Sequence, residues 1–301
     1  FMFNDDIGVI NNLLRSIDPE CHIQWFYSSP AAFWAITFTW VFYAVIVALV
    51  VVAVCAPLLA PFDPDGQELS ARLTAPDATH LLGTDELGRD ILSRLIYGCR
   101  ISLSVGVVSQ LVAIVVGFLL GASAGYLGGR VDAVVSFAIQ VFSSFPFLLF
   151  SLIVMYALGP GLANLYVALG LLMWTTPARL VRGEVMRLRK SEYVLSCVVS
   201  GGSSRRIILR HLLPNCTSTL VVAATLGIPN AILCEASLSF LGLGVQPPTA
   251  SWGQMISASR AYLQTSPWYA LAPGLTIIAT VMACNLFGDA LRDALDPRLR
   301  K

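Results

Sequence analysis

Residues 192–215 read EYVLSCVVSGGSSRRIILRHLLPN, a polar and strongly basic segment between long apolar stretches. Glycine adopts a positive φ at little cost, so Gly201 and Gly202 favour a turn in the middle of this segment. Pro214 is expected to stop a helix near the end of the segment. The pattern predicts two short helical pieces joined at the glycines. A compact, bent segment of this kind can transmit force to the apolar stretches beside it.

The rest of the chain is strongly apolar. Of 301 residues, 56% are hydrophobic and 12% are charged, and the mean hydropathy is +0.73. This composition is too apolar for a soluble fold of this size. The sequence therefore predicts an all-α membrane protein with six transmembrane helices, each having at least the roughly 20 residues that cross the hydrocarbon core. The expected spans are 34–60, 101–127, 134–158, 163–181, 216–241 and 269–288.

The basic residues predict the orientation of the chain, because Lys and Arg near span ends remain in the cytoplasm. If the N-terminus is inside, the cytoplasm receives the basic cluster between Arg179 and Arg210 and the tail from Arg292 to Lys301. The opposite orientation would carry that cluster across the membrane. We therefore expect both termini in the cytoplasm. The exterior keeps Arg72, Arg89, Arg94, Arg100 and Arg260.

Residues 1–33 form the N-terminal segment before the first expected span. That span lies too deep in the chain, is too long and lacks a preceding basic region, so it does not resemble a cleaved signal peptide. Two interpretations of the segment stay open: an interfacial helix lying flat on the membrane, or a disordered leader. The helix is suggested by the spacing of Ile7, Ile10, Leu13, Leu14 and Ile17.

Four further strings accompany residues 192–215: HLLGTDELGRD at 80–90, EASLSFLGLG at 235–244, QPPT at 246–249 and FGDALRDALDPRL at 287–299. In this order, from about residue 56 to the C-terminus, the strings resemble the second permease subunit of bacterial dipeptide, oligopeptide and nickel ABC importers. One departure lies at Leu195, Ser196 and Cys197, where that family usually has Glu-Ala-Ala. Within 192–215 the matching residues are Glu192, Gly201, Ile208, Leu213, Pro214 and Asn215.

The resemblance implies a type I ABC importer permease fold over residues 34–301, in the bacterial inner membrane. It places exterior loops at 61–100 and 243–268 and a cytoplasmic coupling loop at 182–215. The implied partners are a homologous second permease, two ABC ATPase subunits, an extracytoplasmic solute-binding protein, a peptide substrate and the lipid bilayer, with no nucleic acid. ATP and Mg²⁺ would be bound by the ATPase subunits, and this chain would bind no cofactor.

The coupling loop is expected to contact the ATPase. Ile207, Ile208 and Leu212 would bury an apolar helix face in a groove of that partner. The arginines would pair with acids of the ATPase, or they would merely reflect the cytoplasmic side of the membrane. The full set of expected contact residues is Glu192, Gly201, Gly202, Arg205, Arg206, Ile207, Ile208, Arg210, Leu212 and Pro214.

Three residues within the expected spans are candidates for the translocation pathway: Glu235, Phe145 and Asn285. A carboxylate in hydrocarbon is costly, so Glu235 should either line a water-filled cavity or make a structural hydrogen bond. A second pattern, of small residues every four positions, predicts close approach of another helix, from this chain or from a second permease. Those small residues are Gly117, Gly121 and Gly125.

The exterior loops are expected either to receive the solute-binding protein or to form a purely structural lid. Thr84 or Asp85 would cap an amphipathic helix that runs through Ile91, Leu92, Leu95 and Ile96 and can lie on the membrane surface. The two prolines of QPPT suggest a fixed, extended backbone in the second loop. The candidate docking residues are Asp85, Glu86, Arg89, Asp90, Gln246 and Trp252.

The sequence argues against chemistry performed by this chain. Neither Lys190 nor Lys301 follows the glycine that a phosphate-binding loop needs, so ATP must be bound elsewhere. The seven cysteines and three histidines show no metal-ligand spacing. A similarity at residues 142–147, FSSFPF, favours oligopeptides over dipeptides, nickel chelates or another small solute. The alternatives from other classes are a stand-alone secondary transporter and a membrane sensor or scaffold.

Overall fold

The computed structural model describes residues 29–295, with side chains for residue 41 and residues 43–292. Every regular element in this range is a helix, which confirms the predicted all-α class for the described residues. The short elements are η1 (Leu69–Ala71), α8 (Glu192–Val199), α9 (Ser204–Ile207), the π-helix η2 (Ile208–Leu212), α11 (Trp252–Ser259) and η3 (Arg260–Tyr262).

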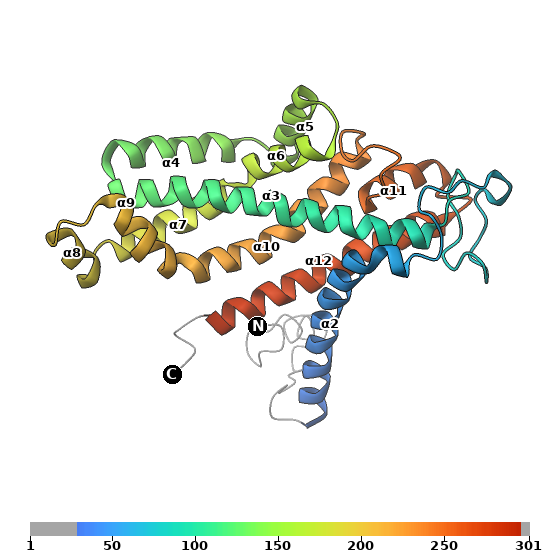
Figure 1. Cartoon of the computed structure of the whole chain (residues 1–301), viewed down its shortest axis with the longest axis horizontal. Helices are drawn as coiled ribbons and strands as arrows, with labels where there is room; N and C mark the ends of the chain where they lie inside the picture. The colour runs from blue at the N-terminus through green and yellow to red at the C-terminus, as the bar shows by residue number, and fades with distance from the viewer. Residues whose placement is uncertain (1–28, 296–301) are drawn as a thin grey trace, which may run out of the picture.

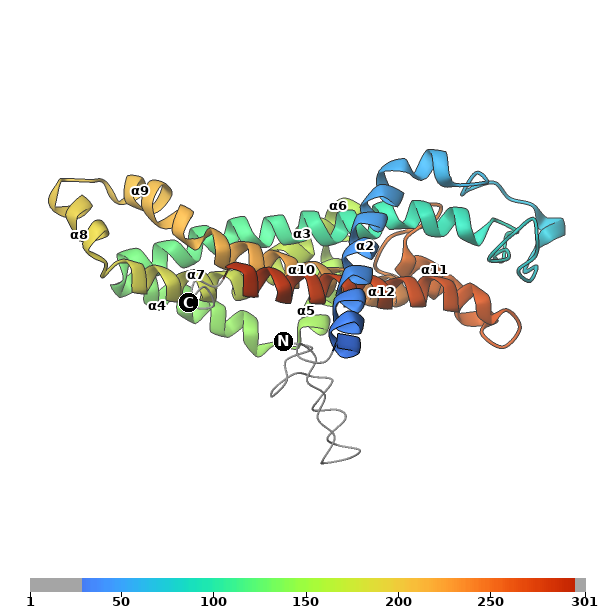
Figure 2. The same ribbon diagram turned by 90° about the horizontal axis from the view of Figure 1, so that it is seen from below.

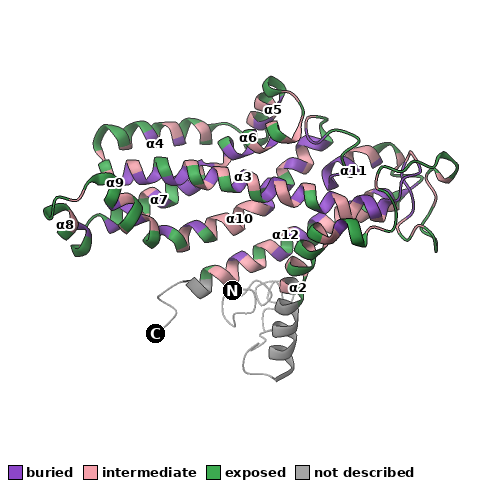
Figure 3. Cartoon of the chain, in the orientation of Figure 1, coloured by how far each residue is buried: buried purple, intermediate pink, exposed green. Residues whose placement is uncertain are grey.

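Three long helices run along the long axis of the molecule: α3 (Ile91–Leu127), α10 (Leu213–Phe240) and α12 (Pro267–Leu295) (Figure 1). α2 (Ser29–Leu59) leaves this bundle at a steep angle, as Figures 1 and 2 both show. The buried residues follow α3 and α11, whereas α4 (Gly129–Ser144) and α8 are largely exposed (Figure 3). α3 is thus the central helix around which the others pack.

Three helical stretches within the described residues are long and apolar enough to cross a membrane. α4 and α5 (Phe147–Leu158) qualify only as a pair, and the chain bends by 94° between them. The structure therefore has three such spans, or four if the bent pair counts as one. The six-span topology and the cytoplasmic termini stay predictions. The three stretches are Ile91–Leu127, Ser204–Phe240 and Pro267–Arg292.

Two expected spans are interrupted. Within 134–158, Phe145 is extended (φ −91°, ψ 139°), because Pro146 disfavours a helical conformation of the residue before it. Within 163–181, Trp174 separates α6 (Leu162–Met173) from α7 (Thr175–Leu188). The expected boundaries were therefore too simple for this part of the chain.

α3 begins ten residues before the expected span. Its N-cap is Asp90, whose carboxylate accepts hydrogen bonds from the backbone N–H and the hydroxyl of Ser93, both at 2.7 Å. The predicted cap at Thr84 or Asp85 and the separate surface helix were therefore wrong, because residues 91–100 are the first turns of α3. At 37 residues, α3 is about 55 Å long, well beyond the hydrocarbon core.

The glycine stripe of α3 packs against α7 of the same chain. A Cβ atom at Gly117, Gly121 or Gly125 would overlap backbone atoms around Trp174, Ala178 and Arg182 of the opposing segment. Small residues allow such close approach, and the contact gains dispersion energy where lipid offers no hydrophobic driving force. The choice left open by the sequence is settled in favour of an intramolecular partner.

Candidate functional site

A groove of about 1160 Å³ runs along one face of α10. Its lining residues on α10 recur every three or four positions, which is the spacing of a single helix face. α3, α5, α6 and α7 supply the other walls. From α10, polar and apolar side chains share the lining: Asn215, Ser218, Val222, Leu226, Asn230 and Ser237.

The end of the groove nearest residues 192–215 is charged. Glu184 and Arg187 of α7 form an ion pair there, and Arg292 of α12 also lines the groove. Farther along, Thr175 and Thr176 add hydroxyl groups to the walls. Because these groups can replace water around a polar solute, the groove can hold such a solute inside an otherwise apolar helical body.

The three predicted pathway residues do not line this groove. Glu235 is fully buried, and its Oε1 accepts hydrogen bonds from the hydroxyls of Ser239 (2.7 Å) and Ser251 (2.8 Å). These bonds tie α10 to the segment before α11, which favours the structural interpretation over the cavity. Phe145 is half exposed at the bend before α5, and Asn285 is exposed on α12. The assignment of these three residues to a translocation pathway stays a prediction, and none of them belongs to this groove.

Sequence reasoning missed the polar face of α10. Asn215, Ser218, Asn230 and Ser237 all lie on the groove. Their spacing of three to four residues, or multiples of it, marks one face of a helix, so the signal was present in the sequence. A single acid in a span attracted attention because of its charge. A periodic row of weakly polar residues was the better indication of the groove.

Residues 192–215, which we call the knob, have the predicted bent shape. α8 ends before Gly201, which has a φ of +78°, and α9 begins after Ser203, its N-cap. Pro214 does not stop the helix, however. It lies in the first turn of α10, directly after the π-helix η2, inside a helix that continues on both sides of it. Residues 204–240 consequently form one continuous helical stretch through the π-helix.

The knob exposes a different apolar surface from the one expected. Ile207 and Leu212 are buried in the chain's own core with Val194 and Cys216, so they have no surface left for a partner. Ile208 is half-buried against the same core. Three exposed aliphatic side chains come from α8, namely Leu195, Val198 and Val199, the last 89% exposed, and Leu209 of η2 is 45% exposed.

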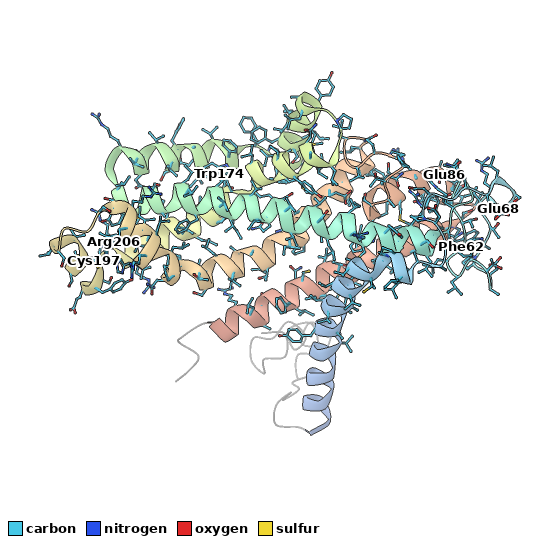
Figure 4. The ribbon with its side chains drawn as sticks, in the orientation of Figure 1. Phe62, Glu68, Glu86, Trp174, Cys197 and Arg206 are labelled. Atoms are coloured by element: carbon cyan, nitrogen blue, oxygen red, sulfur yellow. The ribbon has the colours of Figure 1, made fainter. Side chains whose placement is uncertain are left out.

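The charged residues of the knob point outward. Glu192, Arg205, Arg206 and Arg210 are exposed, as is Pro214. Figure 4 shows Arg206 and Cys197 at one end of the long axis and Glu68 and Glu86 at the opposite end. The groove therefore lies in a body whose two ends carry different polar surfaces.

Residues 60–90, which we call the cap, form a folded unit held by buried ion pairs. Asp85 and Arg89 are almost completely buried and pair at 2.7 Å between Oδ2 and Nε. Asp90 is also buried, and its Oδ1 accepts a hydrogen bond from Nδ1 of the His80 ring at 3.0 Å. Arg94 lies beneath them, fully buried, with its Nε 3.5 Å from the Asp85 carboxylate. These groups hold loops together and present no docking face.

The other candidate docking residues divide in the same way. Trp252 is fully buried and donates from Nε1 to the Leu95 carbonyl oxygen at 3.1 Å. Glu86 accepts from the Tyr269 hydroxyl at 2.6 Å. Gln246 is exposed, although its amide donates to the Gly242 and Gly244 carbonyl oxygens. The cap thus fits the structural lid, and the docking assignment is corrected for Asp85, Arg89, Asp90 and Trp252.

Acidic side chains do remain on the open surface of the cap. Asp63, Asp65, Glu68 and Asp77 are exposed. The backbone N–H of His80 holds the pKa of the Asp77 carboxyl below its usual range, so this group stays charged in mildly acidic surroundings. The charged surface of the cap is therefore mainly acidic, with Arg72 as an exposed base, whereas that of the knob is mainly basic.

A helical membrane body with a lengthwise polar groove, a basic knob at one end and a folded cap at the other defines the class: a subunit that conducts a solute across a membrane. Comparison with known proteins gives the family. The chain belongs to the inner-membrane components of binding-protein-dependent transport systems, whose family pattern matches residues 117–301.

Curated relatives agree with this assignment. The dipeptide transport system permease protein DppC of Bacillus subtilis is 43% identical over 258 residues, covering 85% of this chain and 81% of that protein. The nickel transport system permease protein NikC of Escherichia coli K12 is 43% identical over 255 residues, covering 85% and 92%. The oligopeptide transport system permease protein OppC of Haemophilus influenzae is 38% identical over 260 residues, covering 85% and 83%. The chain is an inner-membrane permease subunit of an ABC importer.

Proposed function

We propose that this chain forms half of the pathway through which an ATP-driven importer moves peptides that a solute-binding protein delivers. One observation carries the proposal: residues 204–240 form one helical stretch that begins in the knob and lines the groove. A force applied to the knob therefore moves a wall of the groove. A homologous second permease supplies the opposite half, as the two-state opening of a pathway between paired subunits requires.

The knob is the ATPase contact in this proposal. Leu195, Val198 and Val199 offer the apolar face that enters the ATPase, in place of the buried Ile207 and Leu212. Gly201 and Gly202 give the knob its bend, while Ile208 and Pro214 join it to α10. ATP and Mg²⁺ bind in two partner ATPase subunits, which perform the hydrolysis. The exposed charges available to pair with those subunits are Glu192, Arg205, Arg206 and Arg210.

The cap and the exposed loop that contains Gln246 receive the solute-binding protein. The exposed acids of the cap offer a negative surface, which steers a partner with a complementary basic patch. Gln246 stays in this surface, and Glu86 lies at its edge. The buried pairs beneath fix the shape of the surface. The acids are Asp63, Asp65, Glu68 and Asp77.

The proposed substrates are peptides. The relatives are named as permeases for dipeptides, nickel and oligopeptides, and dipeptides occur most often in these names. Short peptides are therefore the first solutes to test, and the oligopeptide preference suggested by residues 142–147 stays a prediction. A polar groove lined by hydroxyls and amides suits a peptide backbone, which carries both donors and acceptors.

The test is to tag the chain at its C-terminus, solubilise the membrane gently and identify the copurifying proteins by mass spectrometry. The proposal expects a second permease, ATPases and a solute-binding protein, and it expects ATP-dependent uptake of alanyl-alanine when these are reconstituted together. A secondary transporter would act as this chain alone and would stop when a proton uncoupler is added. Uptake by the isolated chain without ATP would overturn the proposal.

A further inference from the structure

Gln110 lies near the middle of α3 and lines the groove. Its side chain is 3% exposed, and its Nε2 donates to the carbonyl oxygen of Ala223 on α10 at 3.2 Å. A carboxamide at this depth of a membrane helix is costly. An apolar side chain such as leucine would fill the same space without that cost. Packing alone therefore does not explain why residue 110 is a glutamine.

Gly227 provides the space in which the amide lies. A Cβ atom at position 227 would overlap the Oε1, Cδ and Nε2 atoms of Gln110, so only glycine lets this amide rest on the α10 backbone. The Ala223 carbonyl oxygen can only accept, which assigns the NH₂ group to that side and the oxygen to the other. The contact joins the centre of α3 to the centre of α10.

The amide oxygen of Gln110 has no hydrogen-bond partner. Oε1 is sealed from solvent and unpaired in this conformation. An unpaired buried acceptor loses its hydration without compensation. A turn of the side chain away from Gly227 would bring this oxygen to the groove that Gln110 already lines, where a donor of the solute could pair with it.

The surroundings select the kind of donor. The charged groove residues Glu184, Arg187 and Arg292 belong to the C-terminal turns of α7 and α12, and that part of α7 packs against Gly125 of α3, 15 residues along the helix from Gln110. The neighbours of the Gln110 amide, Ala223 and Gly227, carry no charge. An ammonium ion would lose its hydration there without an anion to pair with, whereas a neutral N–H would not carry that cost.

We propose that Gln110 is a specificity-determining residue of the groove, whose amide oxygen accepts a hydrogen bond from a backbone amide N–H of the transported peptide. This inference rests on the proposed function and deepens it. In the closed arrangement Oε1 of Gln110 lies against Gly227. In the conducting arrangement it accepts the hydrogen bond from the peptide N–H. Solutes without a neutral N–H donor then cross less readily.

The experiment compares alanyl-alanine with alanyl-N-methylalanine, in which the amide N–H is replaced by a methyl group. Uptake of each is measured in proteoliposomes that contain the complete importer, its binding protein and ATP. The variants are Gln110→Met and the matched control Gln140→Met, since Gln140 is exposed on α4 and does not line the groove. For each protein the uptake of alanyl-alanine is divided by the uptake of alanyl-N-methylalanine. Because the binding protein is the same throughout, its own preference cancels when this ratio is compared between a variant and the wild type.

The wild type and Gln140→Met should prefer alanyl-alanine, and Gln110→Met should reduce that preference by about tenfold through a higher KM for alanyl-alanine alone. An unchanged preference in Gln110→Met, beside ATP-dependent uptake by the wild type, would overturn this inference and leave the proposed function standing. If the wild type took up neither peptide, the proposed function would fail and the inference with it. Gln110→Leu replaces Gln110→Met where the latter does not reach the membrane.

Discussion

The knob and the inner part of the cap, residues 80–90, are both rich in charge, yet these charges lie on opposite sides of the protein surface. In the inner cap, acids and bases occur within a few residues of each other, and Asp85 pairs with Arg89 inside the protein. In the knob, Arg205, Arg206 and Arg210 have only Glu192 as an acid within the segment, and all four are exposed. Mixed charge in a short segment can neutralise itself in the fold, whereas charge of one sign stays available for a partner.

The largest effect is expected when a buried acid of the cap is removed, which tests whether these acids stabilise the fold. Asp85→Ala removes the carboxylate nearest to the buried Arg89, which keeps only Glu86 at 3.4 Å, and frees the backbone N–H of Leu87. The free energy of unfolding should therefore fall by about 3–5 kcal/mol. Thermal unfolding in detergent measures this loss. Glu68→Ala, at an exposed position of the cap, is the control and should change little. Normal stability of Asp85→Ala combined with weaker binding-protein affinity would restore the docking role.

A second comparison is made within the knob. Ile207→Ala opens a cavity in the core and should lower the free energy of unfolding by about 2–5 kcal/mol. Leu195→Ala, at a side chain that is 51% exposed, should keep stability and weaken association with the ATPase. Unfolding curves and copurification of the ATPase distinguish the two. If Ile207→Ala were fully stable but lost the ATPase, the assignment of the inward and outward faces would be wrong.

The bend of the knob gives an intermediate effect. Gly201 has a φ of +78°, which costs an ordinary residue roughly 1–2 kcal/mol. Gly201→Trp should therefore leave membrane insertion intact while reducing ATP-dependent uptake, measured with radiolabelled peptide. Gly201→Asn tolerates this φ and serves as the control. Equal uptake by all three proteins would remove the bend from the coupling mechanism.

The smallest effect is expected at Glu235. Glu235→Gln supplies an amide oxygen that can accept from the hydroxyls of Ser239 and Ser251 in place of the carboxyl Oε1, so uptake should stay close to that of the wild type. Glu235→Leu removes the acceptor and should cost about 1–3 kcal/mol of stability. A large loss of uptake in Glu235→Gln at unchanged stability would place this residue in the pathway after all.

The sequence predicted the features that depend on local chemistry. The apolar composition indicated a helical membrane protein, and Gly201 with its flanking segments indicated the bent knob. Both follow from residue type and nearest neighbours alone. The family resemblance was likewise carried by short strings, and the comparisons confirm it.

The features that failed depend on tertiary partners. Arg94 interrupts the apolar pattern of α3, so the predicted span started at residue 101 instead of Ile91. The fold buries this arginine beside Asp85, which the sequence alone did not indicate. Ile207 is apolar, as a residue that binds a partner would also be. Only the packing of α7 and α10 around it shows that its side chain is buried within this chain. The groove residues were missed because several helices together define a groove.

Residues 204–240 are proposed to move as one rigid helix that transmits motion of the ATPase to the wall of the groove. Leu209 is partly exposed in the π-helix of that stretch, and Leu209→Pro interrupts the helix at a cost of about 3 kcal/mol while leaving α8 untouched. Uptake and ATPase association are measured together in proteoliposomes, with Leu209→Ala as the control. The account predicts retained ATPase association and lost ATP-dependent uptake. Wild-type uptake by Leu209→Pro would contradict it.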